Sequence, residues 1–241
     1  MFNLTNDYSL QRVKIDDCHL SLYLNTYQKS YLNVNDMAFM AMTYLSLFEL
    51  NTFHKFNYLF LKYDYLVRCI FLKKIFKNIF GIEICEEHLH RNKYGKPFYY
   101  GQSNLFQFNI SHSTNDRESA IIFVCLEKMS GYEQDIQIGA DIELNCCSVE
   151  HYEFISQVLS QMNYELTIEM HHLNRYWSII EALGKCMGKG LSSQWEQLTV
   201  KDISQKRSVF INKFDNNEYV VESVFIKDLN HYAYICINRK V

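Results

Sequence analysis

The stretch from Trp177 to Leu191 constrains the fold more than any other part of the sequence. Its first two-thirds predicts a helix, and three glycines near its end loosen and then stop that helix. Trp177, Glu181 and Lys185 are spaced four residues apart, so their side chains share one helix face. The simpler interpretation is an exposed ion pair above a core tryptophan, which stabilises a helix by roughly a few tenths of a kcal/mol.

Two acidic residues upstream change this interpretation. The alternation of residues 139–144 predicts a strand whose apolar side chains face one side, while Asp141 and Glu143 face the other. Like charges on one strand face repel, although charges at a solvated sheet edge also discourage aggregation. The alternative is a site for Mg²⁺, which takes carboxylate and phosphate oxygens as ligands. Glu181 would then provide a third carboxylate, and Lys185 would reach a phosphate oxygen.

The composition argues against several classes of protein. A chain of 241 residues can form one large domain or two small ones. Apolar residues make up 48% of the chain, so disorder is not expected, and the net charge of −3 argues against a nucleic-acid binder. The eight cysteines show no CxxC pair, which favours reduced thiols in a cytoplasmic protein. No signal peptide is recognised, and the longest apolar run is too short to span a membrane.

Periodicity and turn residues predict an α+β chain in two halves. A polar stretch at 127–137 favours a boundary, and we divide the chain into halves at 1–131 and 132–241. The acidic strand follows this stretch at once, so the predicted site lies at the junction, where pockets are common. The predicted elements are a strand within 7–31, helices from 37 and over 56–80, strands at 105–113, 120–126 and 138–144, helices within 150–187, and strands near 198–203, 207–214, 218–226 and 231–238.

Other polar residues are candidates for binding an anion. Arg68 belongs to the basic face of its helix, a pattern typical of an ordinary domain helix, a membrane-surface helix or a helix that holds a partner. Pro97 restricts Lys96 to an extended conformation, and a lysine held in this way can meet a phosphate, although a lone turn lysine is usually solvated. Ser111 and His112 lie near the end of the strand predicted at 105–113. His112 is either a hydrogen-bonded structural residue or a donor to a pyrophosphate oxygen.

Residues 94–97 with 108–113, residues 138–143 and residues 177–191 form three blocks, and together these blocks resemble the Sfp type of 4′-phosphopantetheinyl transferase. They span about residue 94 to residue 192, and their order and separations also agree with the family. One such block would be weak support, whereas three in order are specific. The blocks are Tyr94-Gly95-Lys96-Pro97 with Phe108-Asn109-Ile110-Ser111-His112-Ser113, then Ile138-Gly139-Ala140-Asp141-Ile142-Glu143, then Trp177 to Leu191, which matches W-x3-E-x3-K-x2-G-x-G-L.

This resemblance implies a fold and a reaction. It implies two similar-sized α/β subdomains related by a pseudo-twofold, each with a small antiparallel sheet and packed helices. The reaction is Mg²⁺-dependent transfer of the 4′-phosphopantetheine group of coenzyme A to a serine hydroxyl of an apo acyl or peptidyl carrier protein, with release of 3′,5′-ADP. Such an enzyme is expected to be a cytoplasmic monomer. The implied site residues are Asp141, Glu143 and Glu181 for the metal, Glu181 and Lys185 for catalysis, and Lys96, Ser111, His112, Lys185 and Arg68 for coenzyme A.

The sequence departs from the family pattern at three positions, one of which is Ile180, where related sequences often have lysine. Asn163 stands where the family often has a second glutamate, and Glu165 lies two residues further on. Leu59 falls near the position of the arginine that usually holds the 3′-phosphate of coenzyme A, while Arg68 matches a later arginine of the same helix. Two other functions therefore stay open. One is a metal-dependent phosphohydrolase of nucleotides or coenzymes, and the other is a carrier-binding homologue without catalytic activity.

Overall fold

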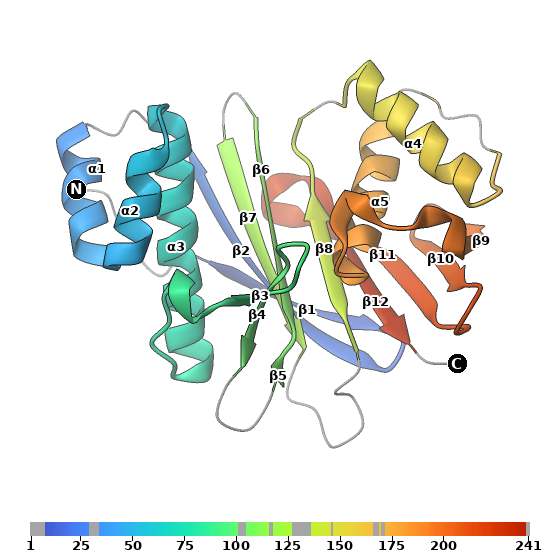
Figure 1. Cartoon of the computed structure of the whole chain (residues 1–241), viewed down its shortest axis with the longest axis horizontal. Coiled ribbons are helices and arrows are strands. Elements are labelled where there is room, and N and C mark those ends of the chain that lie inside the picture. Colours follow the sequence, from blue (N-terminus) through green and yellow to red (C-terminus); the bar gives the residue numbers. More distant parts are fainter. Residues whose placement is uncertain are drawn as a thin grey trace.

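The computed structural model of the chain is an α+β protein with antiparallel sheets (Figure 1). It describes residues 8–28, 34–100, 105–115, 118–126, 136–145, 147–165, 169 and 172–239. The helices in this part are α1 (Val34–Tyr44), α2 (Leu47–Lys55), α3 (Leu59–Phe80), α4 (Val149–Gln161) and α5 (Leu173–Cys186). The strands are β1 (Ser9–Ile15), β2 (Cys18–Gln28), β3 (His90–Arg91), β4 (Pro97–Tyr100), β5 (Leu105–Phe106), β6 (Phe108–Thr114), β7 (Glu118–Leu126), β8 (Ile138–Ile142), β9 (Leu198–Ile203), β10 (Arg207–Asn212), β11 (Glu218–Ile226) and β12 (His231–Arg239).

The described strands form two large sheets and one small one. The first large sheet has the order β1-β2-β7-β6, and the second has the order β8-β12-β11-β10-β9. All neighbouring strands in both large sheets run antiparallel. The small sheet, β3-β4-β5, comes between α3 and β6 in the chain. The edge strand β6 closes the first sheet and the edge strand β8 opens the second.

Strands that are apolar on both faces explain the layering of the molecule. In β7, Ile121 and Phe123 pack into the core beneath α1–α3. The alternate residues Ile122 and Val124 join a second core shared with the other large sheet. Successive side chains of a strand point to opposite faces, so one strand serves both cores. β12 is apolar on both faces in the same way, and its other face packs against α4 and α5. The layers are therefore helices, sheet, sheet and helices (Figure 1).

Local signals account for the helix ends. Ser46 and Glu49 form a reciprocal capping box at the start of α2, with Ser46 N–H donating to Glu49 Oε2 at 2.8 Å. Gly81 ends α3 in the left-handed conformation at φ +66°, which glycine adopts without steric cost.

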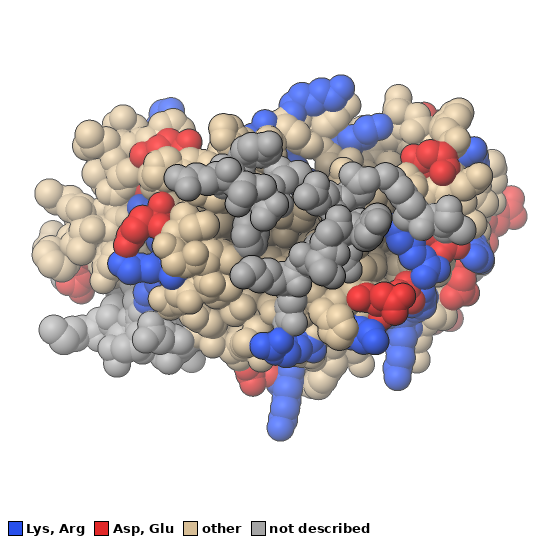
Figure 2. All heavy atoms as spheres, turned by 90° about the horizontal axis from the view of Figure 1, so that it is seen from below, with Lys and Arg blue, Asp and Glu red and all other residues tan. Residues whose placement is uncertain are grey.

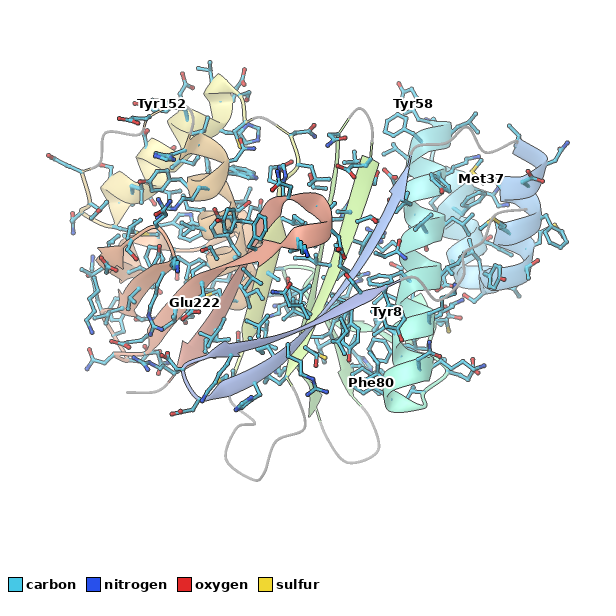
Figure 3. All side chains as sticks on the ribbon, turned by 180° about the vertical axis from the view of Figure 1, so that it is seen from behind. Tyr8, Met37, Tyr58, Phe80, Tyr152 and Glu222 are labelled. Atoms are coloured by element: carbon cyan, nitrogen blue, oxygen red, sulfur yellow. The ribbon has the colours of Figure 1, made fainter. Side chains whose placement is uncertain are left out.

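The β1–β2 hairpin links the two halves of the chain. Figure 3 shows it running from α3, near Tyr8, to the C-terminal sheet near Glu222. At its turn, Asp16 accepts two hydrogen bonds of 3.0 Å from the guanidinium of Arg207 on β10. Arg207 also donates to Glu222 at 2.8 Å, so the hairpin is tied to the second sheet by a charged network.

The predicted elements agree closely with the described ones, and the differences lie mainly in where elements begin and end. Residues 7–31 were expected to contain one strand, and they contain two, which form a hairpin. The hairpin was not predicted because its turn, at Asp16 (φ +52°), lacks the glycine that usually signals one. The helix predicted over 56–80 begins later, at Leu59. The boundary predicted after residue 131 lies outside the described residues. The α+β class is confirmed, whereas the pseudo-twofold stays a prediction.

The surface and the helices limit what the chain can contact. On the face seen in Figure 2, acidic and basic side chains adjoin one another over the C-terminal half, instead of forming a field of one sign. Nucleic-acid binders usually carry a clustered basic surface, and this face has none among the described residues. Within the described ranges, no helix combines the length and the apolar content needed to cross a bilayer.

Candidate functional site

The edge strands β6 and β8 meet where the two halves of the chain join (Figure 1). We call the contact between β6 and residues 140–144 the seam. Side chains at alternate positions of β6 share one face of the strand, and they form hydrogen bonds across the seam. The side-chain oxygen of Asn109 accepts the N–H of Ala140 at 3.0 Å, and Ser111 Oγ donates to Asp141 Oδ1 at 2.9 Å. All four residues are buried, so these hydrogen bonds are shielded from water.

Ser113 continues the seam at the end of β6. Its hydroxyl accepts the N–H of Leu144 at 2.9 Å and donates to Glu143 Oε1 at 2.7 Å. The N–H of Asn145 donates to the same carboxylate oxygen at 2.9 Å. Asp141 and Glu143 therefore project to one side, as the alternation predicted, while Leu144 joins the core between the sheets. Each carboxylate receives a serine hydroxyl from β6.

Helix α5 lies against β8 with very little space between them. A Cβ atom added at Gly139 would lie 1.9 Å from the carbonyl oxygen of Ala182 and 2.3 Å from the backbone nitrogen of Cys186. Glycine is therefore required here for the close approach of the helix to the strand. Trp177 anchors the other end of the helix, with its ring 4.3 Å from that of His151 on α4, centroid to centroid.

This close packing brings the predicted helix residues to the predicted strand residues. Lys185 Nζ lies 2.6 Å from Asp141 Oδ1 and 3.4 Å from Glu181 Oε2, and it donates to Ser111 Oγ at 3.1 Å. Asp141 is buried, whereas Lys185 and Glu181 are partly buried. The other oxygen of Asp141, Oδ2, is buried without a hydrogen-bond partner among the described residues. We call Asp141, Glu181 and Lys185 the acidic cluster.

Burial and charge shift the pKa values in this cluster. Burial raises the pKa of Glu181, attraction to Lys185 opposes the rise, and the nearby charges of Asp141 and Glu143 add to it. Burial alone would lower the pKa of Lys185, but Asp141 and Glu181 outweigh it, so this pKa is raised. Lys185 is therefore a firm cation at neutral pH.

The described residues contain no group of three His, Cys, Asp or Glu side chains gathered as metal ligands. In its place, the ammonium of Lys185 lies between two of the three predicted carboxylates. The chemistry of the site still fits a divalent cation. Asp141 Oδ2 is a buried acceptor to which no described residue donates, and burying such an oxygen is costly unless a cation or water binds it. Asp141, Glu143 and Glu181 are also hard oxygen ligands of the kind that Mg²⁺ takes.

Lys96 lies at a different point of the junction. Its ammonium donates to the carbonyl oxygens of Ile138 at 2.8 Å and Cys186 at 3.5 Å, and burial lowers its pKa. The neighbouring Asn92 donates to the carbonyl of Gly188 at 2.6 Å. Both residues therefore tie the end of α5 to the rest of the junction, and the structure does not bring Lys96 into the acidic cluster. The phosphate contact predicted for Lys96 stays a prediction.

His112 and Arg68 lie near the cluster on its N-terminal side. Loss of water around the ring and the positive charges of Arg68 and Lys185 together lower the pKa of His112 to about 4. Because solvent reaches the exposed His112, the repulsion from the two cations is the firmer of these causes. The imidazole is therefore neutral at pH 7, and it would act as a hydrogen-bonding group and not as a cation.

Arg68 also lines a pocket of about 110 Å³ next to α3 and β6. The pocket holds two further basic residues, Lys73 and Arg91, and each of them pairs with an acidic residue of the lining. Lys73 lies 2.5 Å from Glu49, and Arg91 lies 2.8 Å from Glu86. Arg68 has no carboxylate partner in the described part of the chain. Its guanidinium lies over the ring of Tyr65, 5.3 Å from the ring centroid, and no carboxylate of the described residues neutralises its charge.

Two of the three departures from the family pattern, Asn163 and Leu59, can be described by their local structure. Asn163 follows α4 at φ +56°, and Tyr164 donates its N–H back to Leu159 at 2.9 Å. Asparagine is one of the few residues that adopt this left-handed conformation readily, so Asn163 ends the helix. Leu59 is exposed at the start of α3 and carries no charge. Neither position replaces the missing family residue, and Glu165 is exposed to solvent.

Comparison with known proteins leaves the family open. No protein-family model matches the chain, and no curated protein matches it either. The argument for function therefore depends on the residues of the site.

Sequence reasoning missed the roles of Asn109 and Ser113. Both belong to the polar end of a predicted strand, and with Ser111 they occupy alternate positions. That spacing was a signal for one polar strand face. What it could not show is that the partner of this face is the acidic strand from the other half of the chain.

Proposed function

We propose that the chain is a 4′-phosphopantetheinyl transferase, which moves the phosphopantetheine group of coenzyme A to a serine of an apo carrier protein. The observation that carries the proposal is the acidic cluster, in which Asp141 and Glu181 meet Lys185 and a buried carboxylate oxygen has no donor among the residues that the structure describes. Carboxylates and a lysine at one point suit a metal bound together with a phosphate. The order of the sequence blocks supports the same function.

Asp141, Glu143 and Glu181 would hold Mg²⁺ in this site. The bound ion supplies Lewis-acid polarisation and neutralises charge on the pyrophosphate. Lys185 would turn from Asp141 to a phosphate oxygen of coenzyme A, because its ammonium sits on a flexible four-carbon stem. Transfer of a phosphoryl-type group needs such positioning and charge stabilisation more than covalent help from the protein.

The reaction needs no further reactant. The serine oxygen of the carrier forms a bond to the β-phosphorus of coenzyme A, and the bond from that phosphorus to the bridging oxygen breaks. The leaving group is 3′,5′-ADP. The serine proton passes to Glu181 or to a water that Glu181 holds.

Arg68 and His112 would contact phosphates at the nucleotide end of coenzyme A. Arg68 lines the pocket beside α3 and has no described carboxylate partner, and charge-assisted hydrogen bonds to phosphate are among the strongest. His112 would donate a hydrogen bond. Ser111 would lie beside the phosphates while it holds Asp141, and Lys96 would approach from the end of α5.

The proposal extends to the architecture and the setting. Each half has its own antiparallel sheet with helices packed on its outer face, which supports a pseudo-twofold between halves divided near residue 131. We propose a cytoplasmic monomer whose partners are coenzyme A and an acidic acyl or peptidyl carrier protein. Neither nucleic acid nor a membrane has a role in this reaction.

The test is a mass measurement. The full chain is mixed with coenzyme A, Mg²⁺ and several apo carrier proteins, and the carriers are weighed. We expect one carrier to gain the mass of a phosphopantetheine group. Asp141→Asn and Glu181→Gln should abolish this gain while leaving the circular dichroism spectrum unchanged, and Lys185→Ala should slow it by roughly 100-fold or more, as for other lost charge-stabilising groups. Asp202→Asn, an exposed residue on β9, is the matched control.

Three outcomes would contradict the proposal. Near-normal transfer by Asp141→Asn or Glu181→Gln would remove the carboxylates from the mechanism. Breakdown of coenzyme A without a carrier would identify a phosphohydrolase. Tight carrier binding without a change of mass would identify a binding protein, in which Lys185 permanently occupies the place of the metal.

A further inference from the structure

The seam contains two hydroxyl–carboxylate pairs, and one of them includes Ser113, a residue to which the proposed reaction gives no role. Ser111 donates to Asp141 and Ser113 donates to Glu143, so each strand carboxylate is held by a serine from the other half of the chain. Both serines are buried, with 4% and 7% of their surface exposed. Hydrogen bonds at such positions are protected from competition with water.

Glu143 needs this support more than Asp141 does. β8 ends at Ile142, and the last residue of β8 paired with β12 is also Ile142, so Glu143 lies beyond the strand ladder. Its side chain would then be free to change rotamer. Ser113 Oγ and the N–H of Asn145 hold the same oxygen, Oε1, at 2.7 and 2.9 Å. No described residue donates to the other oxygen, Oε2, which is left for a ligand.

We propose that Ser113 is a positioning residue for metal binding, which orients Glu143 from across the seam. This inference rests on the proposed function only in taking Glu143 as a metal ligand. Partners that orient metal ligands typically change metal affinity or activity about 10–100-fold when they are lost. Ser113 would act on the affinity for the metal and not on the chemical step, because it touches the ligand and not the reacting atoms.

A matched control separates positioning from simple support of the seam. Asn109 lies on the same face of β6 and is also buried, but within the described ranges its side chain binds only the backbone N–H of Ala140. Removing it weakens the seam without releasing a carboxylate. Ser113 binds both a backbone N–H and Glu143, so of these two residues only Ser113 should change the affinity for the metal when it is removed.

The experiment measures Mn²⁺ binding to the full chain by electron paramagnetic resonance, with Mn²⁺ as the probe for Mg²⁺. Ser113→Ala should weaken Mn²⁺ binding by roughly 10–100-fold. Ser113→Thr keeps the hydroxyl and should bind Mn²⁺ close to the wild-type level. Asn109→Ala should lower the melting temperature but leave Mn²⁺ binding near the wild-type level. In the transfer assay, Ser113→Ala should raise the Mg²⁺ concentration needed for half-maximal rate and change the rate at saturating Mg²⁺ much less.

The outcomes distinguish this inference from the proposed function. Unchanged Mn²⁺ binding by Ser113→Ala, an equal loss in Asn109→Ala, or no Mn²⁺ binding by the wild type would each overturn the positioning role. If the wild type transfers phosphopantetheine while Ser113→Ala binds Mn²⁺ normally, the function stands and the inference fails. If Ser113→Ala alone loses Mn²⁺ while no carrier is modified, the inference stands and the function fails.

Discussion

Replacing Gly139 with alanine should both destabilise the chain and disturb the acidic cluster. The added Cβ would lie 1.9 Å from the carbonyl oxygen of Ala182, about 1.5 Å closer than the 3.4 Å of ordinary contact. Both obstructing groups, this carbonyl and the N–H of Cys186, are backbone atoms, so α5 itself must move. Overpacking of this kind costs about 3 kcal/mol, the upper end of the usual range. For a chain of this size, that cost lowers the melting temperature by about 6–12 °C.

The same movement should reach the chemistry. Lys185 is on α5 and Asp141 is on β8, so a shift of the helix away from the strand lengthens their 2.6 Å contact. A misplacement of about 1 Å can cost about 100-fold in rate. We therefore expect Gly139→Ala to lose both thermal stability and transfer activity.

Calorimetry and the transfer assay check this prediction together. The control is Gly81→Ala, at the end of α3, where an added Cβ meets nothing within 4 Å but the backbone has φ +66°. Its cost is only the strain of the left-handed conformation, about 1–2 kcal/mol, and activity should not change. A Gly139→Ala variant that melts within about 2 °C of the wild type would show that α5 does not lie against β8 as described.

Two further predictions concern stability away from the cluster. Ser46→Ala should lower the free energy of unfolding by about 1 kcal/mol, because it removes the capping box with Glu49. Ser46→Thr keeps a hydroxyl and should retain most of the stability that the cap contributes. Equal melting temperatures for wild type and Ser46→Ala would contradict the role of the cap. The hydrogen bonds from Arg207 lower the pKa of Asp16 below its unfolded value, so the stability that this pair contributes is present above about pH 4 and is lost as the pH falls further. Between pH 6 and pH 3, the free energy of unfolding of Asp16→Asn should therefore fall less than that of the wild type. The control is Asp17→Asn, at the exposed neighbour in the same turn, whose free energy of unfolding should fall as much as that of the wild type. Identical acid profiles for Asp16→Asn and wild type would refute this assignment.

Several features of the site could be predicted because they depend on residues close together in the chain. The alternation of residues 139–144 places Asp141 and Glu143 on one face, and the structure shows that the apolar residues that alternate with them are buried. The spacing of Glu181 and Lys185 predicts a contact within one helix, and their side chains lie 3.4 Å apart. These relations follow from the periods of a strand and a helix, whatever the rest of the chain does.

Contacts across the junction could not be predicted in the same way. The sequence presents Lys96 as a turn lysine free to meet a phosphate, yet its ammonium is held by the carbonyls of Ile138 and Cys186. Nothing near Ser113 in the sequence indicates that its hydroxyl holds Glu143, thirty residues further on. Such contacts depend on how two separate sheets pack, and that packing is decided by the apolar core between them.

The sequence by itself therefore determined the elements, the α+β class and the faces on which the charged residues lie, because hydrogen-bonding periods are local. Only the tertiary structure decided that Lys185 meets Asp141, that one oxygen of Asp141 is buried without a donor in the described part of the chain, and that β6 supports the strand carboxylates. The physical reason is that these distances are set by burial of apolar surface on both sides of the junction, which draws together segments far apart in the chain.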